Sequence, residues 1–229
     1  MKLTILNPKN PEQEFPPSDK ALAEPEGLLA IGGCLSEKRL LNAYRHGIFP
    51  WYNPGEPILW WSPDPRLVLF PEQVVISRSL RKTLRKSVFK VTFDQAFSDV
   101  INACANTRSE GTWISEDIKH AYTRLHASGS AHSIEAWHGD QLVGGLYGVA
   151  MGQVFFGESM FHYQTDASKV AFVTMVQWLK TWGYQLIDCQ VHTDHLVSLG
   201  AENISRQRFL SLLDFHYQAP VHELAWHTT

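Results

Sequence analysis

The sequence contains few cysteines, no long apolar run and no excess of basic residues. Its 229 residues include three cysteines, Cys34, Cys104 and Cys189, which is an odd number and shows no metal-ligand spacing. Unpaired cysteines are typical of a reducing compartment, so we expect a cytoplasmic protein. The residues after Met1 lack the apolar stretch of a signal peptide, and no apolar run approaches the length of a membrane-spanning helix.

The charge balance argues against a protein that binds nucleic acid over its whole surface. The chain has 20 Lys and Arg residues and 23 Asp and Glu residues, which gives a net charge of −3. An anionic partner would therefore need a local basic patch. Apolar residues make up 44% of the sequence, and no repeat or low-complexity tract is present. The length then allows one domain, or one main domain with a small partner.

The first 62 residues are rich in proline, glycine and aromatic residues and are predicted to form a small domain. Ser36 is predicted to cap a helix that runs through Arg45. Residues 48–66 contain five prolines, and proline blocks a regular helix or a central strand, so this segment is predicted to be a stiff aromatic loop. Trp51 in this loop is either part of the core or a stacking platform for a flat ring such as a nucleobase.

A short helix over residues 77–87 is predicted to carry the local basic patch. Ser77 would cap this helix, and Leu80 and Leu84 would point inward. The remaining surface of the helix carries Arg78, Arg81, Lys82, Arg85 and Lys86. A run of charges is often only a solvated face, but this run contains no acidic residue in a chain whose net charge is negative. We therefore expect it to bind an anion, most simply a phosphate backbone.

Residues 89–127 are predicted to contain one strand and two helices. The strand would end at Phe93, and Asp94 would cap the first helix. Ser115 would cap the second helix, whose apolar residues face inward. The turn between the two helices is predicted to expose a second tryptophan, Trp113.

The stretch from residue 132 to residue 191 is predicted to form three strands, a helix and a fourth strand. Turns at Gly139 and Gly152 separate the first three strands, which fits hairpins. A helical spacing of apolar residues follows and ends at Gly183, and the last strand contains the sequence LIDCQ. This order resembles the core of the GCN5-related acyltransferase fold, in which the acyl group lies where the strands flanking the helix separate. The predicted fold class is α+β, with an acyltransferase-like mixed sheet in residues 63–229.

Three polar residues in this stretch are candidates for chemistry. Strand alternation places Asp188 and Gln190 on one face of the last strand and Cys189 on the other. Glu158 lies in the strand before the helix and would converge with them if the two strands are neighbours. Each of these groups could instead be a capping or strand-end group. Burying an unpaired carboxylate is costly, which favours a functional site.

Five segments of the sequence are highly specific in their combined order and spacing. They read EPEGLLAIGGCLS, YRHGIFPWYNPGEPILWWSPDPR, GTWISEDIKHAYTRLH, HSIEAWHGDQLVGGLYGVAMGQVFFGESMF and LIDCQVHTDHLVSLGAENISR. Together they resemble the leucyl/phenylalanyl-tRNA–protein transferases over nearly the whole chain. The resemblance implies transfer of Leu or Phe, and less readily Met, from aminoacyl-tRNA to proteins that begin with Arg or Lys, which marks them for N-degron proteolysis. We expect no cofactor, metal or membrane partner, and a monomer.

The resemblance also assigns roles to individual residues. Asp188 and Gln190 match the catalytic pair of the family, and Glu158 matches the acid of GESMF. Trp51 and Trp113 match aromatic residues associated with the terminal adenosine of the tRNA. A pocket for the Leu or Phe side chain would be formed by Leu146, Phe155, Met175 and Ile187. In our hypothesis Asp188 orients the Gln190 amide, which steers the incoming α-amine and helps to take its proton, and Glu158 attracts the substrate's positive charge. Catalysis by Asp188 through a water is an equal alternative.

Other functions are compatible with parts of the sequence. A coenzyme-A-dependent N-acetyltransferase would share the fold, but the turn over residues 162–168 lacks the glycine that lets a backbone approach a pyrophosphate, and Asp166 would repel it. A non-catalytic tRNA-binding module would use the basic helix and the tryptophans but would leave the polar residues of the last strand unexplained. A covalent route through Cys189 is disfavoured by its strand face, and a zinc site at His192 and His195 by its two-residue spacer.

Overall fold

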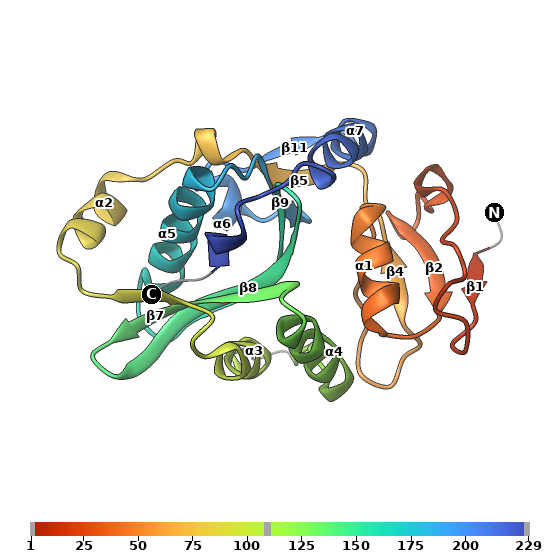
Figure 1. Ribbon diagram of the computed structural model, residues 1–229, viewed down its shortest axis with the longest axis horizontal. Helices are drawn as coiled ribbons and strands as arrows, with labels where there is room; N and C mark the ends of the chain where they lie inside the picture. The colour runs from red at the N-terminus through yellow and green to blue at the C-terminus, as the bar shows by residue number, and fades with distance from the viewer. Residues whose placement is uncertain (1–2, 108–110, 227–229) are drawn as a thin grey trace.

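The computed structural model describes residues 3–107 and 111–226, which form two β-sheets with helices packed around them (Figure 1). The strands of the first sheet lie between Thr4 and Trp61, and those of the second lie between Arg66 and Ile204. The predicted fold class is confirmed, because a small N-terminal unit precedes a larger mixed sheet. The division of the chain between residues 62 and 63 stays a prediction.

The first sheet has four strands in the order β1-β2-β4-β3. Their bounds are Thr4–Leu6 for β1, Leu28–Gly32 for β2, Phe49–Pro50 for β3 and Leu59–Trp61 for β4. The prediction of a loop throughout residues 48–66 is wrong, because β3 and β4 both lie in this segment. The strands form because β4 contains no proline and Pro50 lies in the edge strand β3. At an edge, the missing N–H of proline removes no hydrogen bond from the interior of the sheet.

Helix α1, Glu37–Arg45, begins as predicted after Ser36, whose side chain accepts a hydrogen bond from the Arg39 N–H over 3.3 Å. The chain then turns at Gly47, which has a φ of +69°. A Cβ atom at Gly47 would lie 2.8 Å from the ring of Phe209 in α7, Arg206–Tyr217. Glycine is therefore required here both by the backbone conformation and by the close approach of α7.

The second sheet has seven strands in the order β11-β5-β10-β9-β8-β7-β6. Their bounds are Arg66–Leu69 for β5, Lys90–Phe93 for β6, Ala131–His138 for β7, Gln141–Met151 for β8, Val154–His162 for β9, Leu186–Gln190 for β10 and Glu202–Ile204 for β11. Strands β9 and β10 are parallel, and helix α5, Ala167–Thr181, connects them. The predicted succession of three strands, a helix and a strand is confirmed.

The remaining helices follow the predicted caps with one exception. Their bounds are Arg78–Arg85 for α2, Phe97–Asn106 for α3, Glu116–Ala127 for α4 and Asp194–Val197 for α6, with short 3-10 turns at Ser18–Lys20, Pro71–Gln73 and Glu223–Trp226. Ser77 and Ser115 cap α2 and α4 as predicted, and Ser205 caps α7. Asp94 does not cap α3, because its carboxylate accepts the Ser133 N–H over 2.8 Å instead. No helix within the described ranges is long and apolar enough to cross a membrane.

Two hydrophobic clusters cover the two faces of the second sheet. The first cluster joins residues of the N-terminal unit, such as Tyr44 and Trp60, to Tyr122 of α4 and Phe209 of α7. The second cluster forms between the opposite face of the sheet and α5. Because the first cluster draws on both sheets, the N-terminal unit packs directly against the strands that carry the candidate site.

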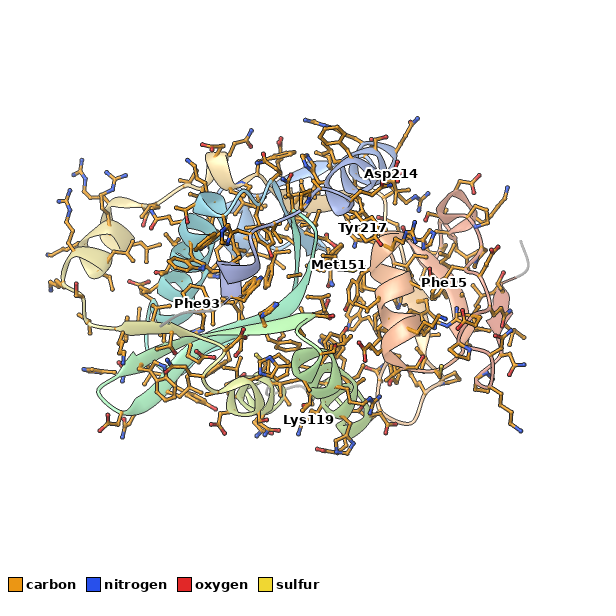
Figure 2. The ribbon with its side chains drawn as sticks, viewed as in Figure 1. Phe15, Phe93, Lys119, Met151, Asp214 and Tyr217 are labelled. Carbon is orange, nitrogen blue, oxygen red and sulfur yellow. The ribbon has the colours of Figure 1, made fainter. Side chains whose placement is uncertain are left out.

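Polar contacts also hold the N-terminal unit in place. The Arg206 guanidinium donates a 2.7 Å hydrogen bond to the Ser62 carbonyl. The Arg45 guanidinium lies 5.1 Å from the ring centre of Tyr217. Figure 2 shows Met151 and Tyr217 close together beside α1, at the junction between the two parts of the chain.

Candidate active site

Strands β9 and β10 pair over three residues and then separate. The last paired residues are Phe156 on β9 and Asp188 on β10. Glu158 and Gln190 each lie two residues farther along their strand. Their side chains can therefore meet across the gap that opens between the strands. In the predicted fold, a donor's acyl group would lie in this gap.

A cavity of about 270 Å³ lies at this separation. One part of its wall is apolar and consists of Leu146, Met160, Phe172, Ile187, Val191 and Leu196. The other part is polar and includes Glu158, Ser159, Gln190, Thr193 and His195. Such a wall fits a ligand that has a moderately sized apolar group next to polar atoms.

Glu158 accepts three side-chain hydrogen bonds at the polar end of the cavity. The Tyr44 hydroxyl donates to Oε1 over 2.8 Å, the Gln190 amide donates to Oε1 over 2.7 Å, and the Tyr122 hydroxyl donates to Oε2 over 2.9 Å. Burial raises the pKa of Glu158 to about 7, and the negative charge of Asp188 adds to the rise while the three donors oppose it. Near neutral pH this carboxyl group can therefore hold a proton or release one.

The two tyrosines stay protonated under the same conditions. Their hydroxyls also contact each other. Burial, with the charge of Glu158 adding to it, raises the pKa of both Tyr44 and Tyr122 well above the ordinary tyrosine value. Both side chains are therefore permanent hydrogen-bond donors toward Glu158.

Gln190 reaches Glu158 because the backbone of β10 changes direction at its end. The pairing of β10 with β5 shifts between Asp188 and Gln190, and Gln190 has a φ of +64°. A left-handed backbone is unfavourable for a residue with a Cβ atom, so other contacts must hold it. One such contact is the hydrogen bond of 2.9 Å from the Gln190 N–H to Oδ1 of Asp188.

Asp188 is fully buried and paired with Arg66. The Arg66 Nε donates to Oδ1 over 2.8 Å, and Nη2 donates to Oδ2 over 2.6 Å. The expected contact between the Asp188 carboxylate and the side-chain amide of Gln190 is not what the structure contains. Asp188 contacts the backbone N–H of Gln190 instead, because the bulge turns the Gln190 side chain toward β9.

Cys189 also lines the cavity, but none of the hydrogen bonds described above involves its thiol. Its side chain packs against the second hydrophobic cluster, on the same face as Ile187. Burial raises the pKa of the Cys189 thiol far above its ordinary value. A thiol of this kind is a poor nucleophile at neutral pH, so the geometry disfavours a covalent route.

The four residues predicted for the aminoacyl pocket fall into two groups. Leu146 and Ile187 line the cavity. Phe155 and Met175 are fully buried in the second cluster and do not line it. Sequence reasoning missed Met160, Phe172, Val191 and Leu196, which complete the apolar wall.

The residues predicted to bind tRNA are spread over the molecule. Trp51 is 44% exposed and lies beside Trp61, with ring centres 5.9 Å apart. The prediction that Trp113 is exposed is wrong, because its indole packs into the first cluster and is only 9% exposed. The five basic residues of the predicted patch are exposed on α2 or directly after it. In Figure 1, α2 lies at one end of the long axis and the first sheet at the other.

The start of α5 contains a carboxylate where a coenzyme-A acetyltransferase would bind a pyrophosphate. Asp166 has a φ of +67° and accepts a hydrogen bond of 3.1 Å from the Thr83 hydroxyl. Lys169 lies 3.9 Å from the same carboxylate. The negative charge at this helix start disfavours a polyphosphate there. His192 contacts Asp194 and Asn203, and the described ranges contain no cluster of three or more His, Cys, Asp or Glu side chains that could hold a metal ion.

Sequence reasoning missed Tyr44, Tyr122 and Arg66 as parts of the site. Both tyrosines lie on helices, where a buried tyrosine is usually a core residue. Arg66 is the first residue of β5, and a basic residue at a strand start carries no signal of a buried partner. Each of the three belongs to an element that comes to β9 or β10 through the tertiary fold, so no local pattern marks it.

The chain is similar to known proteins over nearly its whole length. The family model described as leucyl/phenylalanyl-tRNA protein transferase matches residues 68–214, and the model of the N-terminal domain of that transferase matches residues 33–64. A leucyl/phenylalanyl-tRNA–protein transferase of Methylococcus capsulatus is 59% identical over 226 residues, which are 98% of this chain and 96% of that relative. A protein of the same name from Syntrophobacter fumaroxidans is 61% identical over 93% of this chain and 91% of its own length.

Among solved structures, a GCN5-related N-acetyltransferase from Kribbella flavida is similar over 72% of this chain and 60% of that chain, with 11% identity and a TM-score of 0.37. A likeness of this size says nothing about the reaction. The two family models and the two relatives cover the residues around the cavity and the N-terminal unit that supplies Tyr44. The chain belongs to the leucyl/phenylalanyl-tRNA–protein transferase family.

Proposed function

We propose that this protein transfers Leu or Phe, and less readily Met, from aminoacyl-tRNA to the α-amino group of proteins that begin with Arg or Lys. The transfer would mark these proteins for N-degron proteolysis. The observation that carries the proposal is the meeting of Glu158 and Gln190 at the mouth of an apolar cavity. The names of the relatives, which are similar over almost their entire length, supply the reaction class.

The donor side of the reaction needs little chemical help. An aminoacyl ester on a ribose is already activated, so the protein must mainly hold it in position. The apolar wall around Leu146, Phe172 and Ile187 would receive the side chain of the transferred amino acid. A charged amino acid would lose its hydration there without a partner, which favours Leu, Phe and Met. Phe155 and Met175 would support this wall from behind.

The acceptor side needs a proton to move. An α-amine has a pKa of about 8 in model peptides, and the pKa of Glu158 is about 7. Proton transfer from the ammonium to the carboxylate is therefore nearly balanced. The neutral amine then attacks the ester carbonyl carbon, the peptide bond forms, and the ester bond to the ribose oxygen breaks. That oxygen leaves as a hydroxyl after taking up the proton that the nitrogen loses as the peptide bond forms.

Gln190 and Glu158 would share the task of placing the acceptor. The Gln190 amide, which is 8% exposed, faces the cavity beside the carboxylate and would steer the amine. The negative charge of Glu158 would also favour acceptors with a positive first side chain. In this scheme Asp188 is a positioning residue, because its carboxylate is buried against Arg66 and contacts the Gln190 backbone.

The tRNA would be held mainly through its backbone. The exposed cations of α2 suit phosphates, and the exposed ring of Trp51 suits the terminal base. Trp113 would act from within the first hydrophobic cluster and presents no free face to a base.

The site is built from one chain, so we propose an active monomer, which sedimentation of the protein at assay concentration would check. Cys34, Cys104 and Cys189 form no disulfide. We propose that the protein works in the cytoplasm, where its tRNA substrate is located.

A transfer assay tests the proposal. Purified protein is mixed with radiolabelled Leu-tRNA and with two acceptor proteins that differ only in their first residue, Arg or Gly. We expect label on the Arg-started acceptor alone. Gln190→Ala should lower the initial rate by roughly 100-fold, because a misplaced amine meets the ester in the wrong geometry.

The matched control is Gln185→Ala, which removes an exposed glutamine outside the cavity and should keep the wild-type rate. Equal labelling of both acceptors would contradict the acceptor rule. Absence of label on either acceptor would contradict the proposed function itself.

A further inference from the structure

Arg66 is fully buried at a point where four parts of the fold meet. Its guanidinium makes two hydrogen bonds to the Asp188 carboxylate on β10, and Nη1 donates a third, of 3.1 Å, to the Gly47 carbonyl in the turn after α1. The central carbon of the guanidinium also lies over two rings, 4.8 Å from the ring centre of Phe49 and 4.6 Å from that of Phe209. The side chain is 1% exposed.

These contacts leave the guanidinium one orientation. The rings of Phe49 and Phe209 fix its plane, and the Gly47 carbonyl fixes its rotation within that plane. A fork held in this way presents two parallel N–H groups to a carboxylate, and only one side-chain conformation of Asp188 can accept both. Arg66 therefore determines where Oδ1 of Asp188 lies.

The position of Oδ1 matters because this atom also accepts the Gln190 N–H. Gln190 has the left-handed backbone conformation that turns its amide toward Glu158. A left-handed backbone is unfavourable for a residue with a Cβ atom, so Gln190 should leave this conformation when its N–H has no fixed acceptor. The chain of contacts runs from Arg66 through Asp188 to the Gln190 backbone and then to the Gln190 amide in the cavity.

We propose that Arg66 is a positioning residue for the acyl transfer. It acts through Asp188 on the backbone of Gln190 and thereby sets the direction of the Gln190 amide at the cavity. The proposal rests on the proposed function, since it names a residue that the transfer reaction needs. It gives the buried ion pair a role in the reaction beyond joining β5 to β10.

Lysine cannot replace arginine in this role. An ammonium group retains the charge, but it has no plane to lie over two rings and no fixed fork for two carboxylate oxygens. In Arg66→Lys the pair would keep its attraction while the carboxylate becomes free to rotate. The substitution therefore separates charge from orientation.

The test compares Arg66→Lys with Val100→Ala in the full-length protein. Val100 is fully buried on α3 in the first hydrophobic cluster, outside the cavity wall. For Arg66→Lys we expect kcat for transfer from Phe-tRNA to fall about tenfold or more, with KM for Phe-tRNA changed by less than about threefold. Val100→Ala should lose comparable thermal stability and keep kcat within about twofold.

Amide hydrogen exchange gives a second readout that does not depend on activity. At matched global stability, the Gln190 N–H should exchange about tenfold or more faster in Arg66→Lys than in Val100→Ala, because it has lost a fixed acceptor. Unchanged exchange and unchanged kcat in Arg66→Lys would overturn the proposal. An equal loss of kcat in both variants at equal stability would also overturn it, since the effect would then be merely structural.

If Arg66→Lys does not fold, the double variant Arg66→Met/Asp188→Leu replaces the ion pair by apolar side chains, an exchange that buried ion pairs often tolerate. We expect it to fold and to show fast Gln190 exchange and a loss of kcat of about 100-fold. A folded double variant with wild-type kcat would refute the role of the pair. If the wild-type protein itself transferred nothing, the proposed function would fail, whereas slow wild-type and fast variant exchange at Gln190 would still support the positioning role.

Discussion

Opposing effects of its close neighbours set the pKa of the Glu158 carboxyl group. Enclosure at the end of the cavity disfavours its charge, whereas Tyr44, Tyr122 and Gln190 all donate to it. The first influence is the larger one, because the pKa rises from its ordinary value to about 7. The folded protein therefore stabilises the ionised carboxylate of Glu158 less well than water does.

This imbalance predicts a pH-dependent stability difference between the wild type and Glu158→Gln. A raised pKa in the folded state stabilises the fold fully below the unfolded pKa, and this stability is lost as the pH rises through the folded pKa of about 7. Glutamine does not titrate, and its amide can accept from Gln190 and donate to Tyr122. From pH 5 to pH 8 the wild type should lose about 2–3 kcal/mol relative to Glu158→Gln. Urea unfolding of both proteins at each pH measures this, and parallel curves would contradict it.

At the residue scale, the sequence predicted which polar groups converge but not what holds them. The strand order brought Glu158 next to Gln190, and alternation separated Cys189 from both. The partners Tyr44 and Arg66 lie 114 and 122 residues away from the groups that they bind, so no local pattern connects them. The left-handed backbone of Gln190 has no signal either, because glycine or asparagine usually marks such a position.

Helix α2 is the element whose charge is most concentrated. Arg81, Lys82 and Arg85 are exposed, and none of the ion pairs seen in the described ranges involves them. Replacing the three by glutamine should weaken binding of Phe-tRNA and reduce the slope of log K against log salt by about 2 to 3, because each phosphate contact releases roughly one counterion. Binding measured from 50 to 300 mM KCl, roughly the range in which such slopes are steep, tests this.

The control for this prediction is a second triple variant with the same change of net charge. Lys9, Lys20 and Lys38 are exposed on the N-terminal unit, and their replacement by glutamine should leave the slope almost unchanged. A slope that falls equally in both variants would mean that tRNA responds only to the total charge of the protein. A slope unchanged in both would remove α2 from the tRNA site.

At the element scale, predictions from periodicity and caps were correct where the predicted hydrogen bond lies within the element itself. Ser36, Ser77, Ser115 and Ser205 each accept an N–H from their own helix, so the signal and the contact are both local. The prediction for Asp94 was wrong because a donor on a neighbouring strand, the Ser133 N–H, binds the same carboxylate. The prediction that Trp113 is exposed was wrong for a related reason, because a turn residue can pack into a core formed by elements that are distant in the sequence.

At the scale of the whole molecule, the two sheets share one hydrophobic cluster. We therefore predict that residues 1–62 and 63–229 unfold together rather than as two independent domains. Native-state hydrogen exchange should give the same free energy of opening for protected amides in β2 and in β8. Arg206→Met, which removes the hydrogen bond to Ser62, should lower both values equally. A clearly lower opening free energy for β2 alone would show that the N-terminal unit is independent.

The long sequence separation of the contacts around Glu158 also affects the order in which parts of the protein fold. A helix turn or a hairpin such as β7–β8 can form as soon as its own residues are free to meet. The hydrogen bonds from Tyr44 to Glu158 and from Arg66 to Asp188 close loops of more than 100 residues, as their separations of 114 and 122 show. Loops of that size close late, after the local elements have formed. A folding chain therefore passes through a period in which it has most of its helices and hairpins but no working site.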